Sequence, residues 1–142
     1  LYRDARILTI YEGTSQLQTV AAIRHVTTGG YLKQIRAYEN MEINPRFVAI
    51  RERLVAMTAK YETIVNAVVE TKNQEYIDFV ARRMVEMAGH IIMTYLLIID
   101  ATRDEQFATS AEVYVNYAEA EVEKHYAFIN NFKPEEVEKY KA

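Results

Sequence analysis

The stretch that decides the fold runs from residue 47 to residue 72 and reads FVAIRERLVAMTAKYETIVNAVVETK. Its apolar residues recur alternately three and four positions apart, which is the spacing of a helix packed nearly antiparallel to its neighbours in a bundle. The residues at these positions are Phe47, Ile50, Leu54, Met57, Tyr61, Ile64 and Val68. The spacing predicts one long helix that ends near Lys72.

Two later stretches carry the same period and predict two more long helices. The first places Ile77, Val80, Met84, Met87, Ile91, Thr94 and Ile98 on one face, and the second, from about Ser110 to Asn130, does so with Tyr114, Ala118, Val122, His125 and Ile129. Short polar connections near residues 73–74 and 104–107 force helices that are neighbours in sequence to pack side by side. The pair Lys133-Pro134 predicts a last turn or two of helix.

The residues before residue 47 predict shorter elements. Thr14 can cap a leading helix that runs to Thr28, and the pair Gly29-Gly30 stops it. A short helix is possible over residues 31–39, and Asn44-Pro45 supplies an N-cap followed by proline for the first long helix. The predicted fold class is all-α: an up-and-down helical bundle of three long antiparallel helices plus a leading helix, with residues 1–13 extended or irregular.

Composition narrows the classes of function. The chain has 142 residues, which suits one core, and a formal net charge of −3, so it lacks the broad basic field that would make nucleic acid its main partner. It has no cysteine, which excludes disulfides and thiolate chemistry. The longest apolar run, residues 91–99, is well short of the roughly 20 residues that span a bilayer, and the start lacks a signal-peptide pattern. We therefore predict no transmembrane segment and a cytoplasmic location.

Residues 91–99 are apolar around the whole circumference of a helix. Such a helix must be covered on all sides, so the segment is either the centre of the bundle or a surface for another part of the protein or a second subunit. The second alternative predicts a homo-oligomer. The methionines at positions 57, 84, 87 and 93 are expected to fill the core.

The segment from Arg3 to Gln18 reads RDARILTIYEGTSQLQ and places Glu12 beside Gly13, just before the leading helix. It resembles the Tyr-Glu-Gly-Thr-x-Gln-x-Gln run that members of the acyl-CoA dehydrogenase family carry near the end of their catalytic core. The resemblance implies that residues 1–29 are the end of that core and that residues 30–142 are the helical C-terminal extension of very-long-chain-like members. Because the chain begins at Leu1 inside this motif, we expect it to be a piece of a longer protein.

The resemblance implies an FAD-dependent enzyme that converts acyl-CoA thioesters to trans-2-enoyl-CoA and passes electrons to an acceptor. Glu12 would be the catalytic base for the α-proton, with Tyr11 and Gly13 contacting the substrate and Thr14, Ser15 and Gln16 contacting FAD. The residues alone leave plainer interpretations open: Glu12 as a solvated loop residue, Gly13 as a turn glycine, Thr14 as an N-cap and Tyr11 as packing. The chain by itself is expected to be catalytically incomplete.

Two other functions compete with this interpretation. The chain could be a non-catalytic helical module for interaction or oligomerisation. A metal site could use the pairs Glu86 with His90 and Glu121 with His125, each four residues apart, but di-iron bundles use Glu-x-x-His spacing. The residues three before these histidines are Met87 and Val122, which do not bind a hard metal, so we expect no metal site.

Overall fold

The structure is a computed structural model and describes residues 20–140. These residues form helices and no strand, as the sequence predicted. The α-helices are α2 (Val20–Thr27), α3 (Gly30–Glu39), α4 (Val48–Glu70), α5 (Gln74–Arg103) and α6 (Ala108–Asn131). Short 3-10 helices stand before α4 and α6 and near the C-terminus: η1 (Pro45–Phe47), η2 (Glu105–Phe107) and η3 (Pro134–Tyr140).

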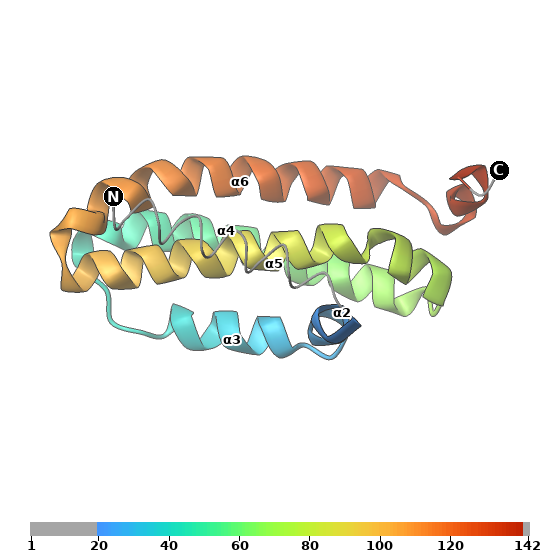
Figure 1. Ribbon diagram of the computed structural model, residues 1–142, viewed down its shortest axis with the longest axis horizontal. Coiled ribbons are helices and arrows are strands. Elements are labelled where there is room, and N and C mark those ends of the chain that lie inside the picture. The colour runs from blue at the N-terminus through green and yellow to red at the C-terminus, as the bar shows by residue number, and fades with distance from the viewer. Residues whose placement is uncertain (1–19, 141–142) are drawn as a thin grey trace.

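The three long helices α4, α5 and α6 run up, down and up, and the two shorter ones pack beside them (Figure 1). Helix α5 contacts α2, α3, α4 and α6, so it is the centre of the bundle. Helices α4 and α5 lie between α6 on one side and α2 and α3 on the other (Figure 1). The sequence left α3 as an uncertain short helix, whereas in the structure it packs against both α4 and α5.

The predicted apolar stripes form the core. All seven predicted positions on α4 and η1 are buried, from Phe47 to Val68, and so are the seven on α5 from Ile77 to Ile98. The five predicted positions of α6 are buried as well. The four methionines expected in the core are also buried. The three-and-four spacing therefore identified the inward faces of all three long helices.

Helix α5 explains the apolar run at residues 91–99. By length and hydropathy alone α5 could cross a membrane, but 78% of its most apolar window is buried inside the bundle. Within the run, Ile92 and Leu96 keep partial exposure and the other residues are buried. Of the two alternatives for this segment, the centre of the bundle therefore accounts for most of its surface.

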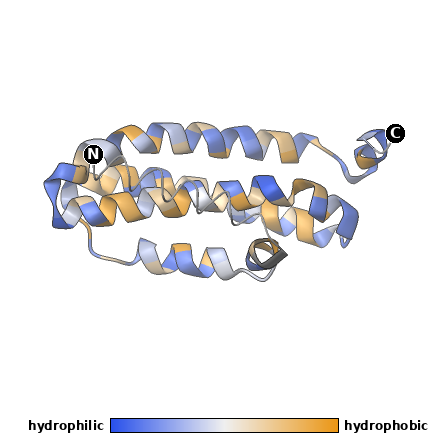
Figure 2. Cartoon of the chain, in the orientation of Figure 1, coloured by the Kyte–Doolittle hydropathy of each residue, from blue (hydrophilic) through white to orange (hydrophobic). Residues whose placement is uncertain are grey.

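Polar residues fix the ends of the long helices. The side chain of Asn44 accepts a hydrogen bond from the Arg46 N–H (2.9 Å), and Asn73 does the same for Tyr76 (3.1 Å). Asp104 accepts from the Gln106 N–H (3.1 Å) at the start of η2. These caps satisfy N–H groups that a helix start leaves free. The connections they occupy are the hydrophilic ends of the bundle in Figure 2.

Helices α2 and α3 meet at the glycine pair that the sequence identified as a helix stop. Gly29 has φ +83° and ψ 12°, a left-handed conformation that glycine adopts without the Cβ clash other residues meet. The N–H of Thr28 donates to the Arg24 carbonyl (2.9 Å), which closes the last turn of α2. The assignment of residues 1–29 and 30–142 to different domains stays a prediction.

A line of ion pairs joins α4 to α6. Arg46 pairs with Glu112 (3.2 Å), Arg53 pairs with Glu119 (3.0 Å), and Lys60 pairs with Glu123. The cations are seven residues apart in sequence, so they lie on one face of the helix that contains or follows them. Because α4 and α6 run in the same direction, the cations and carboxylates meet in the same order along both. We refer to these three pairs as the α4–α6 ladder.

Candidate functional site

The residues that the sequence singled out for chemistry lie outside the described part of the chain. Tyr11, Glu12, Gly13, Thr14, Ser15 and Gln16 all precede residue 20, so their proposed roles stay predictions. Helix α2 begins four residues after Gln16 and ends at the Gly29 turn. The pocket nearest to that turn is therefore the first candidate site in residues 20–140.

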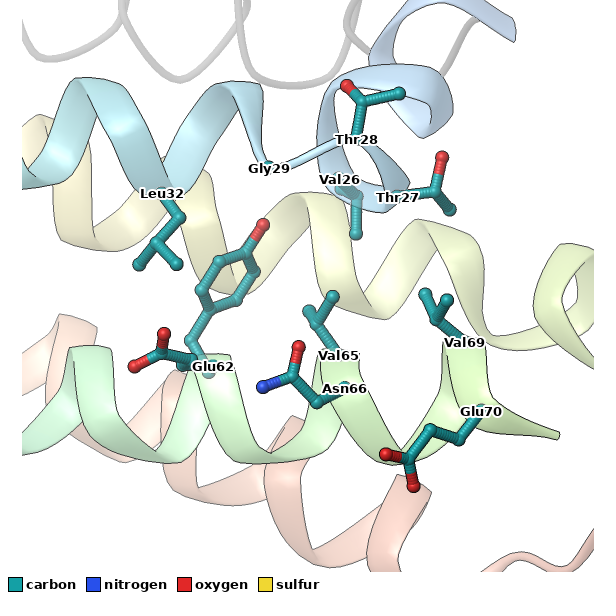
Figure 3. Close-up of a pocket in the computed structure, with 11 residues that line it drawn as sticks. Val26, Thr27, Thr28, Gly29, Leu32, Glu62, Val65, Asn66, Val69 and Glu70 are labelled. Atoms are coloured by element: carbon teal, nitrogen blue, oxygen red, sulfur yellow. The ribbon is translucent and has the colours of Figure 1, made fainter.

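This pocket, which we call the α2–α4 pocket, lies between the α2–α3 turn and one face of α4 (Figure 3). Its volume is about 360 Å³. Val65 and Val69 point from α4 toward the turn, and Val26 points back at them, so its floor is apolar. Carboxylates and hydroxyls surround this floor: Thr27, Thr28, Glu62 and Glu70. The described lining contains no cation, so the pocket suits a neutral group better than an anion.

Some hydroxyl groups of this pocket have hydrogen-bond partners and others have none among the described residues. The hydroxyls of Thr27 and Thr28 both donate to the Arg24 carbonyl (3.2 and 2.7 Å). By contrast, the Tyr61 hydroxyl, on a side chain only 1% exposed, has no hydrogen-bond partner among residues 20–140. The same holds for the buried hydroxyl of Tyr31. Burial raises the pKa of both phenols, and the two tyrosines also interact electrostatically, which raises the pKa of Tyr61 further.

We expect the change Tyr61→Phe to raise the free energy of unfolding by about 1 kcal/mol, because it removes a buried hydroxyl that gains nothing from burial. The matched control is Tyr76→Phe. Its hydroxyl is also buried but donates to the Phe132 carbonyl (2.8 Å), so its loss should cost about 1 kcal/mol. Urea unfolding of both variants measures the two effects. Equal losses in both would show that the Tyr61 hydroxyl has a partner.

A second group of polar residues lies between α5 and α6. The Arg83 Nη1 is 3.2 Å from the His125 Nδ1 and donates to it, which leaves the histidine proton on Nε2. This Nε2 lies 2.9 Å from the Glu86 Oε2, at an angle too poor for a hydrogen bond, so that contact is electrostatic. The Arg83 guanidinium also stacks over the Phe128 ring, 3.7 Å from its centre. The sequence did not predict this cluster.

The pairs weighed as metal ligands are divided among other partners. Glu86 faces His125 of the next helix and also pairs with Arg82 (3.3 Å), and Glu121 pairs with Lys124. His90 is buried, with its Nδ1 2.7 Å from the Tyr114 hydroxyl. Residues 20–140 contain no group of three or more His, Cys, Asp or Glu side chains placed to hold a metal. Both histidines are thus core residues with protein partners.

Acid should destabilise the bundle through these two histidines. Burial lowers the pKa of His90 and His125, an effect that the nearby Glu86 and Glu121 oppose and Lys124 reinforces. Because each pKa is lower in the folded chain, the unfolded chain binds more protons below about pH 6.5, the ordinary histidine value. The contribution of the two histidines to the free energy of unfolding is therefore fully present above that pH. It is lost as the pH falls toward their pKa values in the folded chain.

The expected slope is at most about 1.4 kcal/mol per pH unit for each histidine within this window. Urea unfolding at a series of pH values from 8 to 5 measures it. The variant His125→Gln loses one titration and should show a shallower slope than the unmodified chain. Stability that rises on acidification through this window would contradict the prediction.

Sequence patterns held part of the signal for these groups. Tyr61 occupies a predicted inward position of α4, so the sequence indicates that its hydroxyl is buried. The Arg83–His125 contact joins residues 42 apart in sequence, and no local spacing predicts it. For the segment around Glu12 the case is the reverse: the sequence contains a recognisable motif, but the segment lies outside the described residues.

Comparison with known proteins adds two findings. Residues 27–137 match the protein family described as acyl-CoA dehydrogenase C terminal. A solved structure, that of the acyl-CoA dehydrogenase family protein from Porphyromonas gingivalis, is similar to this chain with 44% sequence identity and a TM-score of 0.76. The similarity covers 81% of this chain and 100% of that chain. Among curated proteins none matches the sequence.

The family match spans most of the chain and includes α3, α4, α5 and α6 entirely. The similar structure agrees in both sequence and fold, and it extends over more than two thirds of the chain. Both findings agree with the resemblance first seen in the segment from Arg3 to Gln18. The chain belongs to the acyl-CoA dehydrogenase family.

Proposed function

We propose that this chain is the C-terminal part of an FAD-dependent dehydrogenase that introduces a trans-2 double bond into acyl-CoA thioesters. The observation that carries the proposal is the match of residues 27–137 to the family's C-terminal region, which begins a short distance after a Tyr-Glu-Gly-Thr sequence at residues 11–14. The parent protein is then an oxidoreductase acting on CH–CH groups in fatty acid metabolism. A cytoplasmic location and a separate electron acceptor belong to the same proposal.

Glu12 is the proposed catalytic base. An α-proton beside a thioester is only weakly acidic, so its removal needs a carboxylate whose pKa is raised in a dry site. Gly13 lets the backbone approach the substrate, since a side chain would obstruct it, and Tyr11 would line the acyl channel. When bound, FAD accepts the hydride that leaves the β-carbon.

Thr14, Ser15 and Gln16 are the residues proposed to hold FAD. Their hydroxyl and amide groups, with free N–H groups at the start of a helix, can donate hydrogen bonds to an electron-rich ligand. The described residues 20–140 form a closed bundle whose centre, α5, is covered by the other helices. This bundle supports a structural role beside the catalytic core, and the chain alone would be catalytically incomplete.

The test follows flavin absorbance under anaerobic conditions. The complete enzyme containing this sequence should bleach when an acyl-CoA is added, whereas the isolated chain mixed with FAD and the same acyl-CoA should not. Acyl-CoAs of short, medium, long and branched chains are compared, because the sequence does not specify the acyl group. Failure of the complete enzyme to bleach with all of them would overturn the proposed reaction. Turnover by the isolated chain would overturn its proposed incompleteness.

The alternative, a non-catalytic module for interaction or oligomerisation, has one observation in its favour. Val113 and Tyr117 lie one turn apart on α6 and are both exposed, so they place two large apolar side chains side by side on the surface. A homo-oligomer could cover them. A light-scattering mass equal to that of one chain would contradict this role.

A further inference from the structure

A second pocket, which we call the α5–α6 pocket, lies where these two helices meet η3. Its volume is about 530 Å³, within the usual range for small-molecule sites. It is lined by three cations, one carboxylate, one histidine and three aromatic rings: Arg82, Arg83, Lys124, Glu86, His125, Phe79, Phe128 and Tyr140. The proposed dehydrogenation uses none of these residues.

The charge of this pocket differs from that of the whole chain. The lining has three cations and one carboxylate, and Glu121 pairs with Lys124 from outside the lining, so three cations meet two carboxylates, whereas the chain carries a formal net charge of −3. Arg82 and Lys124 are surface side chains, 70% and 57% exposed, so their charged groups can reach a ligand from solvent. The pocket therefore has a small excess of positive charge in an otherwise acidic molecule, and that favours an anion.

One cation of the pocket is held in place. Arg83 stacks on Phe128 and donates to His125, whose side chain is almost completely buried. Glu86 in turn lies against His125. Because these contacts fix the guanidinium before any ligand arrives, binding an anion there loses little side-chain freedom.

The aromatic rings of the pocket pack against one another. Phe79 is stacked on Phe132 (4.9 Å between ring centres) and touches Tyr140 at an angle (5.3 Å). Phe132 stacks on Phe128 as well, so the rings form one continuous cluster. Phe79 and Tyr140 are nevertheless 39% and 63% exposed. Rings that are supported by neighbours and still exposed can each pack against another planar group.

Helix geometry orders the side chains along the pocket. Phe79 precedes Arg82 by three residues and Arg83 by four, so the exposed ring and the cations of α5 lie roughly 5–6 Å apart along the helix, and Glu86 lies beyond them. Helix α6 runs the opposite way, and its Phe128 and Lys124 therefore continue the same order. The cations and the rings of the pocket therefore adjoin one another.

We propose that the α5–α6 pocket binds a nucleotide, with its phosphates at Arg82, Arg83 and Lys124 and its base stacked on Phe79 and Tyr140. A phosphate alone would use only the cations of the pocket, and an uncharged aromatic compound would use only the rings. A nucleotide satisfies both, because its base and its phosphates are separated by the ribose. This inference is independent of the proposed dehydrogenation.

Calorimetric titration of the full chain at low ionic strength tests the proposal with three probes: ADP, pyrophosphate and adenosine. ADP should bind at least about ten-fold more tightly than either of the other two, and its affinity should fall as salt is added. Equal binding of ADP and pyrophosphate would show that the rings are not used and would overturn the nucleotide assignment. Absence of ADP binding would overturn the site.

Variants locate the binding. Arg82→Gln and Lys124→Gln should each weaken ADP binding several-fold, and Tyr140→Ala should weaken binding of ADP but not of pyrophosphate. The matched control is Lys33→Gln, which removes the same charge from an exposed lysine of α3 and should leave ADP binding unchanged. An equal loss in the control would assign the effect to overall charge and overturn the proposal. Thermal unfolding of each variant confirms that the bundle is folded.

Discussion

Replacing Glu12 by glutamine in the complete enzyme is expected to slow exchange of the substrate α-proton with solvent by about 10²–10⁴-fold, the usual contribution of a general base. Glutamine keeps nearly the same size and can still form hydrogen bonds, but its amide cannot take a proton from carbon. The measurement is deuterium uptake at the α-carbon of an acyl-CoA, followed by mass spectrometry. FAD should stay bound, because the residues proposed to hold it, Thr14, Ser15 and Gln16, are unchanged.

The control for this experiment is Glu105→Gln, at an exposed position before α6 that lies outside the motif. It removes one carboxylate as well, so it should leave the exchange rate unchanged. Exchange that persists in the Glu12 variant with FAD bound would place the base elsewhere in the enzyme. Loss of flavin from that variant would instead show that Glu12 has a role in holding the cofactor.

The change Leu97→Ala should lower the free energy of unfolding by about 2–5 kcal/mol. Leu97 is completely buried in the middle of α5, which all four other described α-helices contact. Removing its side chain loses apolar burial and leaves a cavity that the surrounding helices can fill only in part. Urea or thermal unfolding of the full chain measures the loss.

The neighbouring residue supplies a matched control. Leu96 is the same residue type on the same helix, but it is partly exposed, so Leu96→Ala should cost distinctly less. Equally small losses at the two positions would contradict the placement of α5 at the centre of the bundle. Equally large losses would indicate that the exposed side of α5 is covered by another part of the protein.

The helical bundle could be predicted from the sequence because its signal is periodic and repeated. Three and four residue spacings from Phe47 to Val68 and from Ile77 to Ile98 specify an inward face without reference to any partner helix. The caps at Asn44 and Asp104 are also local, since a side chain binds an N–H only two residues away. Such features depend on neighbours in the chain, which the sequence shows directly.

Contacts between helices were harder to predict from the sequence. Glu86 is four residues from His90, but the rotation and offset of α5 against α6 bring it to His125 instead. Spacing along one helix cannot specify that offset. The Arg83–His125 contact was missed for the same reason. For the candidate catalytic residues the order is reversed: the motif around Glu12 supplied the hypothesis, and its geometry lies outside residues 20–140.

The α4–α6 ladder has a consequence for how these two helices select their alignment. Its cations repeat every seven residues, at Arg46, Arg53 and Lys60. A slip of α6 by four residues would leave one pair of opposite charges, Arg53 with Glu123, but a slip by a full heptad would bring Arg53 to Glu112 and Lys60 to Glu119 and restore two. The charges therefore set the phase of the two helices without selecting one repeat, and the unequal sizes of the buried side chains must reject the displaced alignments.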